Sequence, residues 1–335
     1  MRFHWMDTLR GTAILLIVIL HAVELPALLS GVPSPPFFTF LNAAVTPYRM
    51  PMLMVLSGML LGRALSKPPR RYATGKIRTL VWPYAVWVIV YWLVTAPSEF
   101  PQWEDWIATS WLWYIFYLAV YFAVAPFLTR LPTVIPPLVF WTVSAIVPDP
   151  HWTQLFLFAG YFFAGHAVWQ HRALLRRADN GWVVLGGVVA AILLPVGYML
   201  QQAGNTFWIP LRNEELIYAP LTLLGIGALV LVAKRIPDRF TAPLRYFGRN
   251  SVVFYLIHFP VQILVTNLLG RGWLWDWRLH VGLGIAIPVG LGMVIVWLRR
   301  WPLVDAFFVM PWPGAREKTS LAGDAARGRR AVDGS

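Results

Sequence analysis

Five ionisable residues lie inside long apolar stretches of the chain: Arg10, His21, Glu24, Arg49 and His258. A charge near the centre of a bilayer costs about 2.5 to 3.5 kcal/mol on insertion scales, so such residues are functional candidates by default. A neutral imidazole can take a proton from a hydroxyl near pH 7, or carry a transferred group on a ring nitrogen. The set therefore suits acid–base or group-transfer chemistry inside a membrane.

The spacing of these residues predicts a shared polar path. His21 follows Arg10 by eleven positions, so on a helix the two side chains point within about 20° of each other, roughly 16 Å apart along the axis. Glu24 follows His21 by three positions and can neighbour it. His21, Arg49 and His258 each fall about 16 to 20 Å from the cytoplasmic ends of their predicted helices. We therefore expect a polar tunnel, with Arg10 near its cytoplasmic mouth.

Each candidate also has a purely structural interpretation. Arg10 can be a snorkelling anchor at the membrane surface, and Arg49 with Glu24 can form an ion pair between helices. His258 can satisfy a backbone carbonyl that the proline two residues later leaves unpaired. A structural role is hardest to find for His21, because the apolar run before it offers no partner for the ring.

The composition predicts the helices that must position these residues. The 335-residue chain is 58% hydrophobic and 13% charged, with a mean hydropathy of +0.59, whereas soluble domains are near half apolar and a quarter charged. Ten apolar runs could each cross a hydrocarbon core of about 30 Å. They lie near residues 8–29, 40–62, 79–97, 109–129, 133–148, 152–171, 181–201, 215–233, 247–269 and 279–298.

This pattern predicts an all-α polytopic membrane protein with about ten transmembrane helices. Residues 1–313 form the membrane domain, and the polar, aperiodic residues 314–335 read as a disordered cytoplasmic tail. A secretory signal peptide in the first thirty residues is the alternative interpretation of the N-terminus.

The distribution of Lys and Arg sets the expected orientation. With the N-terminus inside, 23 of the 28 basic residues fall in cytoplasmic segments and three on the opposite side, so both termini are expected in the cytoplasm. This topology signal accounts for the net charge of +13 without nucleic acid as a partner. The chain has no cysteine, which excludes thiolate metal sites, and we expect no metal. A multi-pass protein of a bacterial inner membrane fits these features.

Several ordered motifs carry a family resemblance. The stretch from Trp5 to Ala13, followed by apolar residues to His21, resembles the first-helix signature of the acyltransferase 3 family of integral membrane acyltransferases. Arg49-Met50-Pro51-Met52 before Leu56-Ser57-Gly58 is similar to the second-helix pattern of its fucose O-acetylase-like branch. Similar patterns lie at Lys76 to Leu80, Trp113-Tyr114, Phe158 to Tyr161, Gly248 to Ser251 and Tyr255 to His258. The resemblance covers positions 5 to about 262.

The resemblance implies transfer of an acyl group, expected to be acetyl, from cytoplasmic acyl-CoA to a hydroxyl of a glycan or glycolipid on the far side. The anionic nucleotide would be attracted to basic residues of the first cytoplasmic loop and to the tunnel mouth. These are Arg10, Arg63, Arg70, Arg71, Lys76 and Arg78. Many members carry two arginines three positions apart in this loop, whereas here position 75 is glycine, flanked by Lys76 and Arg78.

The same resemblance assigns roles inside the membrane. His21 would act as general base or as a transient acyl carrier, with Arg10 guiding the thioester towards it. From their predicted depth alone, Glu24 could orient the ring, and Arg49 could stabilise the oxyanion on the thioester carbonyl. His258, Ser57 and Asn250 are expected to contact the acceptor.

A proton-coupled secondary transporter is the competing function, because transporters also place His, Glu and Arg at the midplane and interrupt helices with proline. Internal repeats are common in that class. The later half of this chain has no second copy of the Arg10-to-His21 arrangement, which favours the enzyme.

Overall fold

The computed structural model describes residues 3–173, 181–202, 218–270 and 276–311, and within them the chain is helical, without strands. The predicted tail from residue 314 lies outside the described residues, as does the start of the predicted eighth span at 215–217. The helices that exceed ten residues are α1 (His4–Ser30), α2 (Pro36–Met59), α5 (Trp82–Thr95), α6 (Trp113–Leu128), α7 (Ile135–Ile146), α8 (Pro150–Gln170), α10 (Gly181–Gln202), α11 (Ala219–Arg235), α12 (Asp238–Arg249), α13 (Ser251–Gly270) and α14 (Trp277–Leu298). The shorter ones are α3 (Leu61–Leu65), α4 (Pro69–Lys76), α15 (Pro302–Asp305), the π-helix η1 (Ile77–Val81) and the 3-10 helices η2 (Trp103–Trp106) and η3 (Ser110–Leu112).

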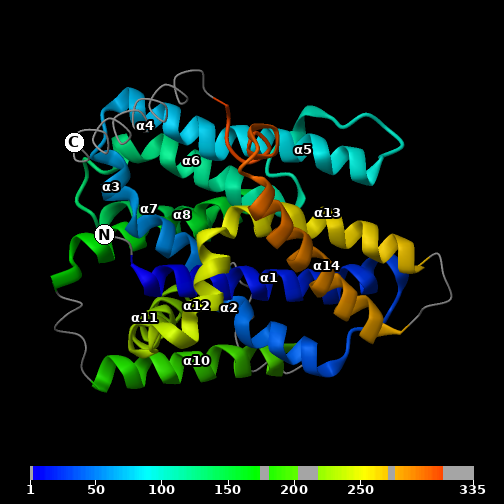
Figure 1. The fold of residues 1–335 in the computed structure, drawn as a ribbon. Helices are drawn as coiled ribbons and strands as arrows, with labels where there is room; N and C mark the ends of the chain where they lie inside the picture. Colours follow the sequence, from blue (N-terminus) through cyan, green and yellow to red (C-terminus); the bar gives the residue numbers. More distant parts are fainter. Residues whose placement is uncertain (1–2, 174–180, 203–217, 271–275, 312–335) are drawn as a thin grey trace, which may run out of the picture.

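Helix α1 runs through the middle of the molecule and packs against α2, α12, α13 and α14 (Figure 1). Helices α4, α5 and α6 lie above it in this view, and α10 and α11 lie below it. Helix α8 packs against α2 and α7. The predicted first span is thus the element around which the other candidate-bearing helices gather.

Six helical segments are long and apolar enough to cross a membrane. They are His4–Ser30, Pro36–Leu65, Pro69–Thr95, Ser110–Leu128, Ser251–Gly270 and Trp277–Leu298, and they overlap the first four and last two predicted spans. A helix also overlaps each of the other four ranges, but α7 has 12 residues and α11 has 17, about 18 Å and 26 Å of axial length. The all-helical class is confirmed, whereas ten crossings and the orientation stay predictions.

Two boundaries differ from the prediction. The basic segment before the third span is helical rather than a loop, because Pro69 starts α4 at its first position, where proline needs no N–H partner. Helix α4 then continues through η1 into α5. The predicted ninth span at 247–269 is divided, since α12 ends at Arg249 and α13 begins at Ser251, with Asn250 between them in a non-helical conformation.

Helices α1 and α12 approach closely because glycines face backbone. A Cβ on Gly11 would collide with the carbonyl of Leu244, and a Cβ on Gly248 would collide with the carbonyl of Asp7. Each helix therefore presents a glycine to the other's backbone, which permits this spacing. The crossing holds the start of α1 in place, one residue from Arg10.

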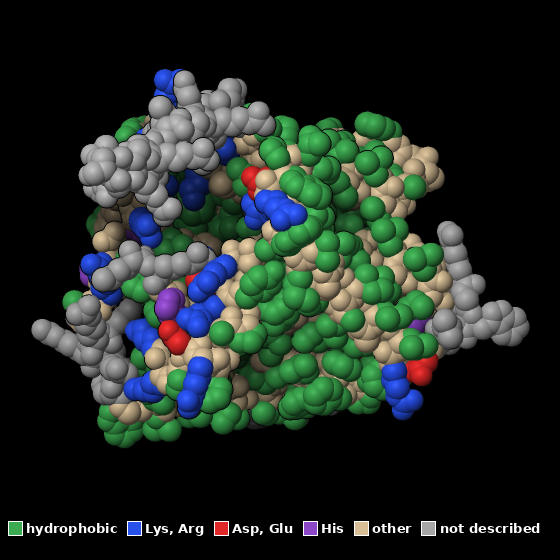
Figure 2. All heavy atoms as spheres, viewed as in Figure 1, with side chains coloured by type: hydrophobic (Ala, Val, Ile, Leu, Met, Phe, Trp, Pro, Cys, Tyr) green, Lys and Arg blue, Asp and Glu red, His purple; other side chains and the backbone are tan. Residues whose placement is uncertain are grey.

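The surface has an apolar middle and charged ends. Figure 2 shows hydrophobic side chains across the centre of the visible face, with Lys and Arg gathered mainly at the end where α12 and the start of α1 lie. Many large apolar residues are exposed, among them Leu93 at 76% and Leu28 at 80%. Such a belt between charged ends is what a membrane-embedded bundle requires.

Candidate active site

Two histidine rings from different helices lie against each other inside the bundle. His21 of α1 stacks on His258 of α13, with ring centroids 5.4 Å apart and planes inclined by 26°. Phe259 meets the His21 ring edge-on at 5.0 Å and stacks on Trp111 of η3 at 4.6 Å. The structure thus brings together two of the predicted site residues, and aromatic rings flank them.

Hydrogen bonds one turn on either side of His258 fix its helix. Gln262 donates from Nε2 to one backbone carbonyl of α1 and one of α14, each at 2.8 Å. The Tyr255 hydroxyl donates to the Trp111 carbonyl, and Trp111 Nε1 donates to the Tyr255 carbonyl at 3.2 Å. Because these buried bonds join α13 to three other segments, the His258 ring is held against α1.

The His258 ring has one nitrogen bonded and one open. Its Nδ1 lies 3.1 Å from the Phe254 carbonyl, and since a carbonyl only accepts, this nitrogen carries the proton in a neutral ring. Nε2 is buried and has no hydrogen-bond partner within the described residues. Pro260 removes the N–H that would pair with the Leu256 carbonyl, so the ring does not bond the carbonyl that the structural interpretation assigned to it. An acceptor nitrogen is left facing the interior.

Glu24 and Arg49 are joined through a third residue. Asn42 of α2 donates from Nδ2 to Glu24 Oε1 at 3.1 Å, and its Oδ1 accepts from Arg49 Nη1 at 2.9 Å. Arg49 is 7% exposed, whereas Glu24 is exposed. The Glu24 carboxylate is therefore bonded to α2 rather than to the His21 ring, one turn away on α1.

Arg10 lines a cavity of about 150 Å³ between α1, α2, η1, α6 and α13. The polar lining consists of Arg10, Ser57, Thr79, Tyr114, Ser251 and Tyr255. The Ser57 and Tyr114 hydroxyls are 3.2 Å apart. Within the part of the chain that the structure describes, the Arg10 guanidinium has neither a hydrogen-bond nor an ion-pair partner. We call this space the Arg10 cavity.

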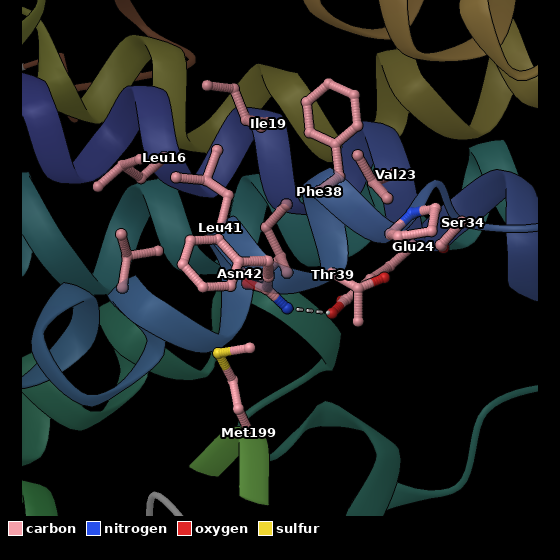
Figure 3. Close-up of a pocket in the computed structure, with 14 residues that line it drawn as sticks. Leu16, Ile19, Val23, Glu24, Ser34, Phe38, Thr39, Leu41, Asn42 and Met199 are labelled. Carbon is pink, nitrogen blue, oxygen red and sulfur yellow. Dashed lines mark hydrogen bonds between the residues drawn. The ribbon is translucent and has the colours of Figure 1, made fainter. Parts of the chain in front are cut away.

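A second cavity, of about 600 Å³, lies beside the other half of α1. It is lined by Glu24, Asn42 and largely apolar residues (Figure 3), and we call it the Glu24 cavity. The Tyr255 ring, which lines the Arg10 cavity, is 5.8 Å from the His258 ring. The stacked imidazoles therefore stand between residues of the two cavities, and a continuous tunnel stays a prediction.

Apart from Arg10 on α1, the predicted donor-binding residues lie on α3, α4 and η1. A surface cavity of about 500 Å³ is lined by Arg70, Arg71 and Arg78, with Thr74 and Pro68. Arg78 also donates from Nε to the Met310 carbonyl at 3.0 Å. We call this space the basic cavity.

Two further basic residues lie near the basic cavity without lining it. Lys76 places its ammonium 3.1 Å from the centre of the Phe122 ring and lies in the electrostatic field of Arg10. Arg63 is exposed on α3. Basic side chains thus continue from the surface towards the Arg10 cavity.

Two predicted acceptor contacts lie on the Arg10 side of the molecule. Ser57 lines the Arg10 cavity. Asn250 sits at the α12–α13 junction, where its amide donates to the Tyr246 carbonyl at 3.0 Å, next to the Arg249 to Asp7 ion pair of 3.8 Å. Neither Ser57 nor Asn250 lines the Glu24 cavity.

Sequence reasoning missed Asn42, Tyr114 and Gln262, which the structure places around the candidate residues. Each is a polar residue inside a predicted span, the same signal that singled out the ionisable candidates. Among the described residues, no group of three or more His, Cys, Asp or Glu side chains could hold a metal ion.

The fold and site define a helical membrane protein with an internal histidine pair between a basic face and a second cavity. Residues 3–297 match the family model for the acyltransferase domain, and the chain belongs to this family. It is a membrane acyltransferase, which sets aside the transporter interpretation. Searches of curated proteins and of solved structures found no match.

Proposed function

We propose that the protein transfers an acyl group, acetyl, from cytoplasmic acyl-CoA to a hydroxyl of a carbohydrate on the opposite side of the membrane. The Arg49-Met50-Pro51-Met52 pattern supports a place in the fucose O-acetylase-like branch. The charge distribution supports cytoplasmic termini and a bacterial inner membrane. The observation that carries the proposal is the His21–His258 stack, which lies between residues that line the Arg10 and Glu24 cavities.

The donor enters from the basic side. Arg70, Arg71 and Arg78 offer guanidinium groups that suit phosphate oxygens, so the nucleotide end of CoA binds in the basic cavity. The thioester end reaches the Arg10 cavity, where an unpaired guanidinium faces a space of about 150 Å³. A space of this size supports a short acyl group rather than a long one.

In the reaction, His21 accepts the proton of the acceptor hydroxyl as the oxygen attacks the thioester carbon. The C–S bond breaks, an ester C–O bond forms, and the CoA thiolate takes the proton from the His21 ring. Arg49 stabilises the oxyanion of the tetrahedral intermediate. The open Nε2 of His258 accepts a hydrogen bond from a neighbouring hydroxyl of the acceptor, which holds the reacting hydroxyl beside His21.

A covalent route uses the same residues. His21 would attack the thioester carbon itself, release CoA and pass the acyl group from its ring nitrogen to the hydroxyl. We favour the general-base route. Rapid acid quenching after mixing with radiolabelled acetyl-CoA separates the two, because only the covalent route leaves label on the protein.

The test is acyl transfer by purified protein from radiolabelled acetyl-CoA to candidate glycans. We expect His21→Ala to reduce the transfer rate by about 10² to 10⁴-fold, the usual contribution of a general base. The matched control is His151→Ala, which changes an exposed histidine at the start of α8. Full activity in His21→Ala would refute the proposed base, and absence of transfer from acetyl-CoA in the unmodified protein would refute the proposed donor.

A further inference from the structure

The Glu24 cavity has a lining unlike that expected for a free sugar. Ten of its fourteen lining residues are apolar, supplied by α1, the first half of α2 and Met199 of α10. Protein pockets of about 300 to 1,000 Å³ commonly combine an apolar lining with a few polar groups that orient the ligand. The cavity, at about 600 Å³, lies within that range.

The four polar residues are not spread evenly around the lining. Glu24, Ser34 and Thr39 lie towards one end, beside Val23 and Phe38, and the Asn42 amide points to Glu24 from its place next to Leu41; Leu16 and Leu41 lie towards the other end (Figure 3). The cavity is therefore amphipathic. Its polar end is also the end nearest to the candidate base, because Glu24 is one helical turn from His21 on α1.

This arrangement constrains the ligand. A free oligosaccharide carries hydroxyls over its whole surface, and burying a hydroxyl without a hydrogen bond is unfavourable. The apolar end of the cavity offers no side-chain partners for such groups. A molecule with a hydrocarbon chain and a hydroxyl-bearing head matches both ends.

We propose that the Glu24 cavity binds the acceptor, and that this acceptor is a lipid-linked carbohydrate. This inference rests on the proposed function. The hydrocarbon chain lies among Leu16, Leu41 and Met199, and the sugar hydroxyl lies at the Glu24–Asn42 pair, one turn from His21. The exposed residues Thr39 and Phe40 mark the side from which the acceptor enters from the membrane.

The structure also suggests why α2 leaves room for such a chain. Proline occupies positions 47 and 51 inside this helix, and each proline removes a backbone hydrogen bond and favours a bend. The cavity is lined by residues of α2 before Pro47, whereas the Arg10 cavity is lined by Leu53 and Ser57 after Pro51. The two halves of α2 therefore serve different cavities.

The test is photo-crosslinking in phosphatidylcholine nanodiscs with a dodecyl glucoside that carries a diazirine at the chain end. We expect label on residues 16–23 of α1 and 38–45 of α2, located by mass spectrometry. Val45→Phe, which fills the cavity, and Thr39→Trp, which obstructs its exposed side, should each reduce this labelling several-fold. The matched control, Leu28→Phe, changes an exposed residue of α1 outside the lining and should label as the unmodified protein does.

Two results would overturn the proposal. One is labelling spread equally over lipid-facing positions such as Leu93, which would mean that the cavity holds bilayer lipid only. The other is unchanged labelling in both Val45→Phe and Thr39→Trp. Two variants are used because the two substitutions differ in their risk to folding. The readout needs no acyl transfer, so failure of the proposed reaction appears separately, in the acetyl-CoA assay.

Discussion

Asn42 determines how the charges of Glu24 and Arg49 interact, because its amide stands between them. Nδ2 of Asn42 donates to the Glu24 carboxylate, and Oδ1 of Asn42 accepts from the Arg49 guanidinium. The bond from Arg49 holds its guanidinium against α2, which makes Asn42 a positioning residue in the proposed reaction, where Arg49 stabilises the oxyanion.

We expect Asn42→Leu to lower kcat by about tenfold or more, since a lost hydrogen bond to a charged group is worth about 1.5 to 3 kcal/mol. Asn42→Asp should keep the bond to Arg49 and place a second carboxylate against Glu24. The measurement is kcat and KM for acyl transfer, with the melting temperature as the check on folding. Equal kcat in Asn42→Leu and the unmodified protein would show that the amide has no positioning role.

At this scale the sequence indicates candidate residues, but it does not indicate their partners. The cost of a buried charge singles out His21, His258 and Arg49 from one chain alone. Whether Glu24 meets His21 or Asn42 depends on the rotation of α1 against α2, which the sequence does not specify. The expected Glu24–His21 contact is replaced by Glu24–Asn42 for that reason.

The crossing of α1 and α12 depends on glycines that no side chain can replace without movement of a backbone. Gly11 and Gly248 each face a carbonyl of the other helix. The crossing also brings Arg249 to Asp7, whose side chain is only 4% exposed. Arg10 directly precedes Gly11 in α1, so the position of the Arg10 cavity depends on this contact.

We expect Gly248→Ala to destabilise the protein by about 1 to 3 kcal/mol, the usual result of overpacking a close contact. The matched control is Gly282→Ala in α14, where an added Cβ meets nothing within 4 Å and should be neutral or stabilising by up to about 1 kcal/mol through helix propensity. Thermal unfolding in detergent measures both. A Gly248→Ala protein as stable as Gly282→Ala would contradict the described crossing.

The contact between the start of α1 and the start of α12 should contribute to stability in a pH-dependent way. The hydrogen bond from His4 lowers the pKa of Asp238 below its ordinary value, and the nearby charge of Arg245 adds to this. A carboxylate with a lowered pKa stabilises the folded state at neutral pH, and this contribution is lost as the pH falls through the lowered pKa.

We therefore expect Asp238→Asn to melt slightly below the unmodified protein at pH 7, with the difference closing only below about pH 4, the ordinary pKa of the side chain. The measurement is the melting temperature across a pH series. Glu104→Gln, a change in the exposed η2, is the control. A difference that does not shrink at low pH would mean that the charge on Asp238 is not its cause.

Helix locations followed from apolar runs, but helix ends did not. Every predicted span overlaps a helix because burial of twenty apolar residues in lipid dominates all local preferences. The division at Asn250 and the helical start at Pro69 depend on local backbone conformation and on packing against α1, which hydropathy does not register. The shortness of α7 likewise reflects where the chain turns, not its composition.

The membrane topology of the whole molecule can be tested because of its amino-acid composition. The chain has no cysteine, so one introduced cysteine reports its own side of the membrane. We expect an impermeant maleimide to label Ser66→Cys only from the cytoplasmic side and Ser98→Cys only from the outside, because Pro69–Thr95 separates them. Labelling of both from one side would contradict that crossing.

The same labelling decides whether α7 crosses the membrane. Ten spans predict opposite sides for Pro132→Cys and Pro148→Cys, which flank α7 and are both exposed. A shared side would reduce the number of crossings. The basic residues alone predict an orientation, which this labelling tests. The sequence does not determine the number of crossings, because a 12-residue apolar helix suits either a thin crossing or a buried core segment.

The rings of Trp111, Phe259, His21 and His258 have one more effect. A passage wide enough for a thioester would also conduct water and ions, and would dissipate the electrochemical gradient of an energised membrane. In the proposed reaction, the close packing of these rings would let a small group be transferred while the bilayer stays insulating. An enzyme of this kind would work across the membrane without behaving as a leak.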